Sequence, residues 1–142
     1  MEQHKHLTYL IKLIADRQET LFTQKAGPIP VTAPQSRLLL YLQSRDGAPV
    51  SQRELEHYLG VSHTTVKGLL QRLEEKGLVR TAFDSEDGRV KHAYLTEEFH
   101  QLHNSVADCI DRFEADVFRN FSEADCAALR ALLERVYANI LP

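Results

Sequence analysis

The sequence predicts a mainly α-helical protein with one small antiparallel β-hairpin. Glycines follow successive stretches of helix-like apolar spacing, as residues that end helices do; they are Gly27, Gly47, Gly60 and Gly77. Serine or threonine precedes several such stretches in the position that caps a helix N-terminus, at Thr32, Ser51, Ser62 and Ser122. Two β-prone runs flank a polar segment at residues 84–89, which is the pattern of a hairpin.

The first two predicted helices span residues 5–26 and 33–45. Helix 5–26 has one apolar stripe, formed by Leu7, Leu10, Ile11, Ile14 and Leu21. Helix 33–45 begins at Thr32, with Pro34 in its first turn and Gln35 placed to complete a capping box. The proline-rich connector between the two helices is expected to be stiff and extended.

Helices 52–59 and 63–76 are joined by a three-residue turn that contains Gly60. Two short helices joined in this way form a helix-turn-helix. Its inward positions are apolar: Leu55, Leu59 and Val61 against Val66, Leu69, Leu70 and Leu73. At about 100° per residue, the opposite face of the second helix carries Thr64, Lys67, Gly68 and Gln71. A polar, unobstructed outer face is what a DNA-recognition helix needs.

Gly68 is unusual because it lies inside a helix. A glycine at an exposed helix position costs about 1 kcal/mol relative to alanine. One interpretation is that the helix backbone comes close to a groove wall or a phosphate at this point. The alternatives are neutral drift or a contact with another helix.

Strands 78–83 and 90–95 directly follow the helix-turn-helix and complete a winged helix. Arg89 is expected at the hairpin tip, where Asp84 and Asp87 flank it and can hold its guanidinium by charge-assisted hydrogen bonds. An arginine so placed fits a narrow minor groove, where the negative potential is enhanced. The alternative is a solvated turn with ordinary surface salt bridges.

Two further helices, at 97–120 and 123–140, end the chain. Apolar residues recur in both at helical spacing: Phe99, Leu102, Val106, Ile110, Phe113 and Val117 in the first, and Cys126, Leu129, Leu133, Val136 and Ile140 in the second. These helices provide more apolar surface than is needed to cover the core of a winged helix. A two-fold dimer interface is their plainest use, and completion of a monomeric core is the alternative.

Composition places the chain among globular proteins, since apolar residues make up 43% and charged residues 26% of its 142 residues. The net charge of −3 is uneven: residues 1–50 carry +2, residues 51–96 carry zero and residues 97–142 carry −5. The middle of the chain can therefore still meet a polyanion. No apolar run reaches the roughly 20 residues of a membrane span, and no signal peptide is recognisable. We expect a reduced, cytoplasmic protein that does not bind membranes.

Metal, thiol and catalytic chemistry have little support. His100 and His103 share a helix face, with Cys109, His4 and His6 as more distant ligands, but no four-ligand zinc spacing results. Cys109 and Cys126 are expected to be buried in apolar packing rather than linked to each other. No phosphate loop, nucleophile elbow or metalloprotease motif is present. We therefore expect no cofactor, no bound metal and no enzyme activity.

Residues 51–96 resemble the MarR family of bacterial transcription regulators. The matching stretches are Glu54-Leu55, Leu59, Val61-Ser62, Thr64-Thr65-Val66, Leu73-Glu74, Gly77-Leu78-Val79, Asp84, Asp87, Arg89 and Leu95-Thr96. The order of elements is similar to the family over nearly the whole chain. One departure lies in the wing, which usually reads like Asp-Pro-x-Asp-Arg-Arg. Here Gly88 replaces the first arginine of that pair and Glu86 adds an acid.

The resemblance implies a homodimer that binds a pseudo-palindromic operator in double-stranded DNA, usually as a repressor released by a small-molecule effector. It implies a single domain over residues 1–142, with a winged helix-turn-helix lobe at 32–96 and a helical dimerisation region at 1–26 and 97–142. It also implies an effector pocket between the dimer helices and the DNA-binding lobe, for which the candidate residues are Arg17, Phe22 and Tyr41.

Residue chemistry suggests the individual DNA contacts. Thr64 and Gln71 can bond to base edges, and Lys67 can bond to guanine or a phosphate. Backbone N–H groups at the start of the recognition helix suit a phosphate. Arg89 is expected to enter the minor groove from the wing, with Asp84 and Asp87 holding its guanidinium. The expected DNA-binding residues are Arg53, Ser62, His63, Thr64, Thr65, Lys67, Gly68, Gln71, Arg89 and Lys91.

Two alternatives remain open at the level of sequence. The neutral charge of residues 51–96 and the altered wing favour a winged-helix protein-interaction module that does not bind DNA. A metal- or thiol-responsive regulator would keep the DNA function and change only the signal.

Overall fold

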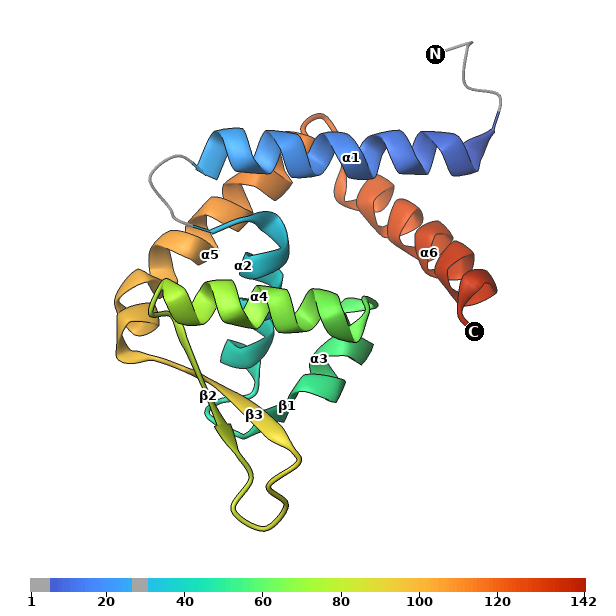
Figure 1. Ribbon diagram of the computed structural model, residues 1–142. Helices are drawn as coiled ribbons and strands as arrows, with labels where there is room; N and C mark the ends of the chain where they lie inside the picture. Colours follow the sequence, from blue (N-terminus) through green and yellow to red (C-terminus); the bar gives the residue numbers. More distant parts are fainter. Residues whose placement is uncertain (1–5, 27–30) are drawn as a thin grey trace. The chain divides into compact units, whose positions relative to one another are not determined.

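The computed structural model describes residues 6–26 and 31–142, and it is mainly α-helical with a small β-sheet, as predicted (Figure 1). His4, Gly27 and the prolines of the connector fall outside the described residues. The elements in chain order are α1 Leu7–Ala26, α2 Ala33–Ser44, β1 Val50–Ser51, α3 Gln52–Leu59, α4 His63–Glu75, β2 Val79–Phe83, β3 Lys91–Leu95, α5 Glu97–Val117 and α6 Glu123–Ile140. The chain divides into two compact units, one ending at Cys109 and one beginning at Ile110.

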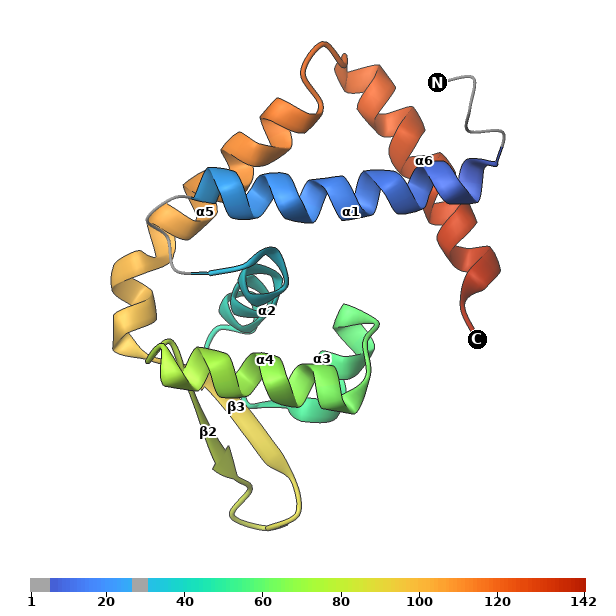
Figure 2. The same cartoon turned by 45° about the horizontal axis from the view of Figure 1, so that its top comes forward.

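The predicted hairpin is the main part of an antiparallel sheet with the strand order β1-β3-β2. Strand β2 pairs with β3 from Val79 opposite Leu95 to Phe83 opposite Lys91. The hairpin projects away from the helices as a wing (Figures 1 and 2). Strand β1 was not predicted, because two residues are too few to show a period-2 pattern. It pairs with β3 through Val50 opposite Ala93.

The core of the first unit joins the helix-turn-helix to α2, the sheet and the first half of α5. Its fully buried side chains include Leu38, Leu39, Val50, Leu55, Val66, Leu73, Phe99 and Val106. The predicted packing between α3 and α4 is confirmed for Leu55 and for the four inward residues of α4. Leu59 is half-buried, whereas Val61 is exposed, so its predicted burial is wrong.

Capping residues begin the helices at the predicted positions. Thr32 forms the full capping box with Gln35. Ser51 accepts a hydrogen bond from the backbone N–H of Glu54, which is one half of the capping box that the sequence Ser51-Gln52-Arg53-Glu54 predicts. The Glu54 carboxylate instead accepts hydrogen bonds from Tyr41 Oη at 2.6 Å and from Arg45 at 2.7 Å. Gly60 ends α3 with φ of +66°, a left-handed conformation that glycine adopts without steric cost.

The terminal helices carry apolar side chains that the single chain leaves uncovered. On α1, Leu7, Ile11 and Ile14 are exposed, and Leu7 is 76% exposed. In the second unit, no residue of α6 is buried, and Leu133, Val136 and Ile140 are among its exposed apolar residues. Cys126 is exposed too, so its expected burial is wrong, whereas Cys109 is buried as predicted; both thiols are free. Within residues 6–26 and 31–142, no helix has the length and apolar character to cross a membrane.

Candidate nucleic-acid interface

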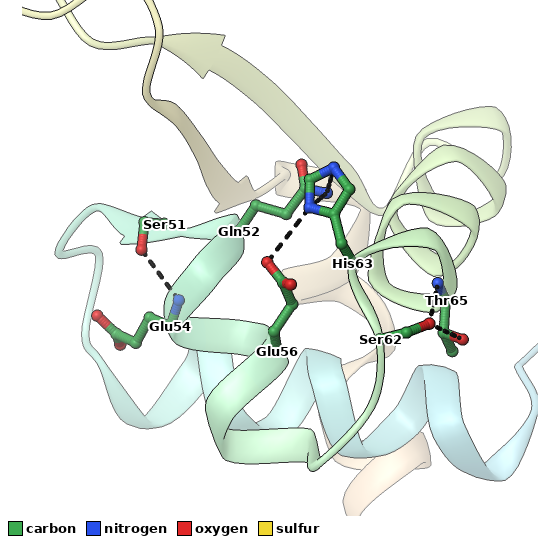
Figure 3. Close-up of polar contacts among 7 residues, drawn as sticks. All are labelled: Ser51, Gln52, Glu54, Glu56, Ser62, His63 and Thr65. Carbon is green, nitrogen blue, oxygen red and sulfur yellow. Dashed lines mark hydrogen bonds and ion pairs between the residues drawn. The ribbon is translucent and has the colours of Figure 1, made fainter.

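The outer face of α4 is open to solvent. Its first turn is capped by Ser62, whose Oγ accepts a hydrogen bond from the backbone N–H of Thr65 and lies 2.9 Å from Thr65 Oγ1 (Figure 3). Thr64, Lys67 and Gln71 are exposed on the side opposite the buried residues of the same helix. The sequence therefore placed these residues correctly on the free face of α4.

His63, the first residue of α4, contacts two residues of α3. Its Nδ1 lies 3.3 Å from Oε2 of Glu56 and 3.2 Å from Nε2 of Gln52 (Figure 3). These polar contacts between the start of α4 and α3 hold the helix-turn-helix together in addition to its apolar core. Gln52 was not predicted as a site residue. The sequence carries no signal for it, because it is a single polar residue that follows a capping serine.

The turn of the wing is organised by Asp84. Its Oδ1 accepts hydrogen bonds from the backbone N–H groups of Glu86 at 2.7 Å and Asp87 at 3.0 Å. These bonds favour the ionised carboxylate, so they hold the pKa of Asp84 below its usual value. His92 adds a smaller effect of the same sign, with its Nδ1 3.6 Å from Oδ2 of Asp84.

Arg89 projects from this turn and is bonded to Asp87 through its backbone N–H and its guanidinium Nε. Oδ1 of Asp87 accepts hydrogen bonds from the backbone N–H of Arg89 at 3.0 Å and from its Nε at 3.2 Å. The side chain of Arg89 is nevertheless 92% exposed. The predicted partnership is therefore found for Asp87. Asp84 supports the wing differently from the prediction, through the turn backbone rather than through the guanidinium.

Two adjoining hollows separate the wing from the helix-turn-helix. The first, about 210 Å³, lies between Lys67, Gln71 and Glu74 of α4 and Lys91 of β3. The second, about 360 Å³, is lined by residues that include Arg53, Glu56, His63, Arg89 and Lys91. Gln52 and Lys91 line both, and we call the combined surface the wing trough. Four lysines and arginines and one histidine face two carboxylates along it, so the trough is locally basic although residues 51–96 are neutral overall.

Within the part of the chain that the structure describes, Gly68 has no steric reason to be glycine. A Cβ added there would meet only Nη1 of Arg72 at 3.9 Å, an ordinary van der Waals distance. Its φ also lies outside the left-handed range. A contact with another helix, one of the alternatives raised by the sequence, is therefore not found among the described residues.

The candidate effector residues Arg17, Phe22 and Tyr41 have different surroundings in the described structure. Arg17 is exposed and Phe22 is buried. The Tyr41 ring stacks on Tyr58 at 4.0 Å, and its hydroxyl donates to the Glu54 carboxylate, which raises the pKa of Tyr41. The sequence favours solvent-facing positions for His100 and His103; His100 is exposed, whereas His103 is half-buried, and its buried Nδ1 has no hydrogen-bond partner in the described structure. Within the described ranges, no group of three or more His, Cys, Asp or Glu side chains is arranged to hold a metal.

Comparison with known proteins identifies the family. The model of the MarR family matches residues 29–90, which include the helix-turn-helix and most of the wing. The HTH-type transcriptional regulator PecS of Dickeya dadantii (strain 3937) is 33% identical over 99 residues, 68% of this chain. The chain belongs to the MarR family. The match spans 60% of the length of PecS. An uncharacterised HTH-type regulator of Bacillus subtilis (strain 168), YwoH, is 28% identical to this MarR-family chain over 91% of it and 92% of YwoH.

Solved structures confirm the winged-helix fold of this MarR-family protein. The MepR–DNA complex of S. aureus superposes with a TM-score of 0.85 at 26% identity, over 95% of this chain and 98% of MepR. The PcaV regulator of Streptomyces coelicolor, solved with its natural ligand, gives a TM-score of 0.84 at 23% identity, over 94% and 93% of the two chains. A MarR mutant from E. coli complexed with operator DNA gives 0.82 at 23% identity, over 92% of each chain.

Proposed function

We propose that this MarR-family protein is a sequence-specific DNA-binding transcriptional regulator of the cytoplasm that acts as a homodimer on a pseudo-palindromic operator. One observation carries the proposal: the exposed polar face of α4 adjoins the basic wing trough. A helix in the major groove and a strand-borne arginine beside it need this juxtaposition. The similarity to MepR, solved with DNA, supports the same use of the fold.

Base readout is assigned to the middle of α4. Thr64 and Gln71 carry groups that both donate and accept hydrogen bonds, which suits the mixed pattern of base edges in the major groove. Lys67, between them on the same exposed face, can bond to guanine or to a phosphate. Gly68 lies half-buried among them and permits the backbone to come closer than any side chain would.

Phosphate contacts are assigned to the edge of the wing trough. The N-terminus of α4 presents backbone N–H groups beside Ser62, His63 and Thr65, and helix N-termini bind phosphate. Arg53 and Lys91 supply charge from the two sides of the trough. The side chain of Arg89 is 92% exposed and bonds to Asp87 through Nε, so its Nη groups can enter the minor groove.

The homodimer is proposed from the uncovered apolar faces of α1 and α6. A helix with no buried residue, such as α6, gains little from the core of its own chain. Exposed apolar side chains on it, including Leu133, Val136 and Ile140, need a partner surface. A second copy is the simplest partner, because two-fold dimers are the commonest oligomers and a pseudo-palindrome has the same symmetry.

Repression that a small molecule relieves is the regulatory mode that we propose. The support comes from two similar proteins: PcaV was solved with its natural ligand, and the DNA binding of BpsR from Bordetella bronchiseptica is regulated by 6-hydroxynicotinic acid. Arg17, Phe22 and Tyr41 stay the candidate effector residues. The Tyr41 hydroxyl is engaged by the Glu54 carboxylate and Phe22 is buried, so Arg17 is the most exposed of the three.

A second candidate function is a protein-interaction module without DNA binding, which the zero net charge of residues 51–96 and the missing arginine at Gly88 favour. Retention on a random DNA duplex at low salt separates the two, since non-specific DNA binding is electrostatic. The DNA-binding proposal predicts a retarded band that salt abolishes. A protein that leaves random duplex unshifted at low salt is the interaction module.

A further inference from the structure

The hairpin that forms the wing carries one large apolar side chain that nothing covers. Phe83, the last residue of β2, is 65% exposed. No other large apolar side chain of residues 79–95, all of which the structure describes, is exposed. The hairpin projects away from the helices of its own unit (Figures 1 and 2). Single exposed apolar residues are common on protein surfaces, so exposure alone does not assign this ring a function.

Phe83 lies on the face of the hairpin that is turned toward α4. Side chains alternate along a strand, so Val79, Thr81 and Phe83 share one face of β2. Val79 is buried in the core of the first unit. Thr81 Oγ1 donates a hydrogen bond to Oε1 of Glu74 in α4 at 2.8 Å. The ring of Phe83 therefore continues the face of the wing that meets the helix with the exposed polar side.

The same face of the wing carries Lys91. Phe83 is paired with Lys91 in the register of β2 on β3, and the side chains of directly opposed residues lie next to each other. Lys91 lines both hollows of the wing trough, and Arg89 lines one of them. The pairing continues toward the tip, where the Asp84 N–H donates to the Val90 carbonyl at 2.7 Å. Phe83 thus lies at the edge of the wing trough, and Arg89 comes two residues before its cross-strand partner.

Charge gives the wing as a whole little attraction for DNA. Residues 79–95 carry three lysines and arginines and three aspartates and glutamates, so their net charge is zero. Arg89 is in addition ion-paired with Asp87. An apolar contact needs no net charge, because the removal of carbon surface from water is favourable by itself. The deoxyribose rings that form the walls of the minor groove offer such carbon surface, and phenylalanine is among the apolar side chains that proteins place in that groove.

We propose that Phe83 is an apolar DNA contact, which packs against deoxyribose rings of the minor groove beside the point where Arg89 enters it. The contact gives the wing a share of its DNA affinity that does not depend on salt. Deoxyribose is the same at every base pair, so this contact adds affinity without reading sequence. The inference rests on the proposed DNA-binding function and adds a residue and a kind of contact that the function does not itself require.

The test measures the affinity of the full chain for a labelled random-sequence duplex by fluorescence anisotropy over a range of salt concentrations. Phe83→Ala should weaken binding at least about tenfold for a dimer at every salt concentration, since each copy loses one partly buried ring. The slope of log affinity against log salt concentration should equal that of the parent, because this slope counts phosphate contacts and the ring makes none. Phe83→Leu, which keeps apolar surface, should lose less affinity than Phe83→Ala.

A matched variant separates the position of the ring from its presence. The double variant Ala82→Phe/Phe83→Ala moves the ring by one residue to the opposite face of β2, which is exposed at Ala82, and leaves composition and charge unchanged. It should bind DNA as weakly as Phe83→Ala. Binding at the level of the parent would overturn the proposal. A lowered salt slope in Phe83→Ala would overturn it too, because Phe83 would then act only by positioning Lys91.

Photocrosslinking tests the contact without removing the ring. p-Benzoylphenylalanine at position 83, which bonds to nearby C–H groups when it is irradiated, should become joined to the duplex, whereas the same group at position 82 should not. Absence of a crosslink from position 83 to bound DNA would overturn the contact. A parent that leaves the duplex unbound at low salt would refute the proposed DNA-binding function and this contact with it. A parent that binds DNA no better than Phe83→Ala does would refute the contact alone.

Discussion

The Gln52 side-chain amide lies 3.2 Å from Nδ1 of His63 and thereby joins the first residue of α3 to the first residue of α4. The same Nδ1 faces the Glu56 carboxylate at 3.3 Å. One nitrogen cannot accept from the amide and donate to the carboxylate at once. Unprotonated Nδ1 accepts from Gln52, and protonated Nδ1 donates to Glu56, so either state holds His63 at the mouth of the wing trough.

Replacing Gln52 should weaken DNA binding without unfolding the protein. In Gln52→Ala, His63 loses one of its two contacts, and the trough loses an amide that lines both hollows. We expect about a three- to tenfold loss of operator affinity in gel-shift titrations, the usual worth of one hydrogen bond. Gln101→Ala, at an exposed position of α5, is the matched control. Equal affinities of the two variants would remove Gln52 from the interface.

Gly68→Ala should raise stability and lower DNA affinity together. Alanine is favoured over glycine in a helix by up to about 1 kcal/mol, and among the described residues the nearest atom that its Cβ would meet beyond its own stretch of helix backbone is Nη1 of Arg72 at 3.9 Å. Thermal unfolding should therefore shift upward. If α4 approaches DNA closely at this residue, the added methyl group will reduce operator affinity. A stabilised variant that binds DNA as well as the parent would favour neutral drift at this position.

Substitutions of two basic residues of the wing should change DNA binding in different ways. Arg89→Ala should cost about 1–3 kcal/mol in operator binding, because it removes a groove contact. Lys91→Gln should weaken binding to all DNA sequences alike. It should also lower the salt slope, which is the fall of log affinity with log salt concentration, by about two for a dimer, because each copy loses one phosphate contact. For the parent dimer we expect only about four to eight phosphates in the slope, since residues 51–96 carry no net charge. Identical salt slopes for parent and Lys91→Gln would refute that phosphate contact.

The wing turn should keep its order well into acid. The backbone N–H groups of Asp87 and Glu86 lower the pKa of Asp84 in the folded wing below its ordinary value of 3.8. A lowered pKa stabilises the turn above the ordinary value, and this stabilisation is lost as the pH falls through the folded pKa. The carboxyl carbon of Asp84 should therefore titrate below 3.8 by NMR. In Asp84→Asn, the Glu86 and Asp87 amides should exchange faster with solvent at neutral pH. A midpoint at or above the ordinary value would contradict this account of the turn.

The sequence determined the helix ends and the hairpin well, because these depend on local chemistry. Thr32 and Ser62 cap the helices that follow them because their side-chain oxygens accept hydrogen bonds from nearby backbone N–H groups. Gly60 ends α3 because it adopts a positive φ. The exposed face of α4 followed from helical periodicity alone.

What the sequence did not reveal depends on contacts between distant residues. Glu54 has the spacing of a capping box, yet its carboxylate accepts hydrogen bonds from Tyr41 and Arg45 instead. Gln52 becomes a site residue only because α4 brings His63 to it. The place of Phe83 beside Lys91 depends on the register of β2 on β3, which the long turn between the two strands leaves open.

The most direct test of the central claim is selection of bound DNA from a random pool, followed by sequencing. If two copies present α4 to successive major grooves, the enriched sequences will contain inverted half-sites with centres about 10 base pairs apart or a multiple of that spacing. Substitution of Gln71 will then change the preference at one position of each half-site. A pool with no enriched motif, or a motif that ignores Gln71, would contradict the claim that the exposed face of α4 reads DNA.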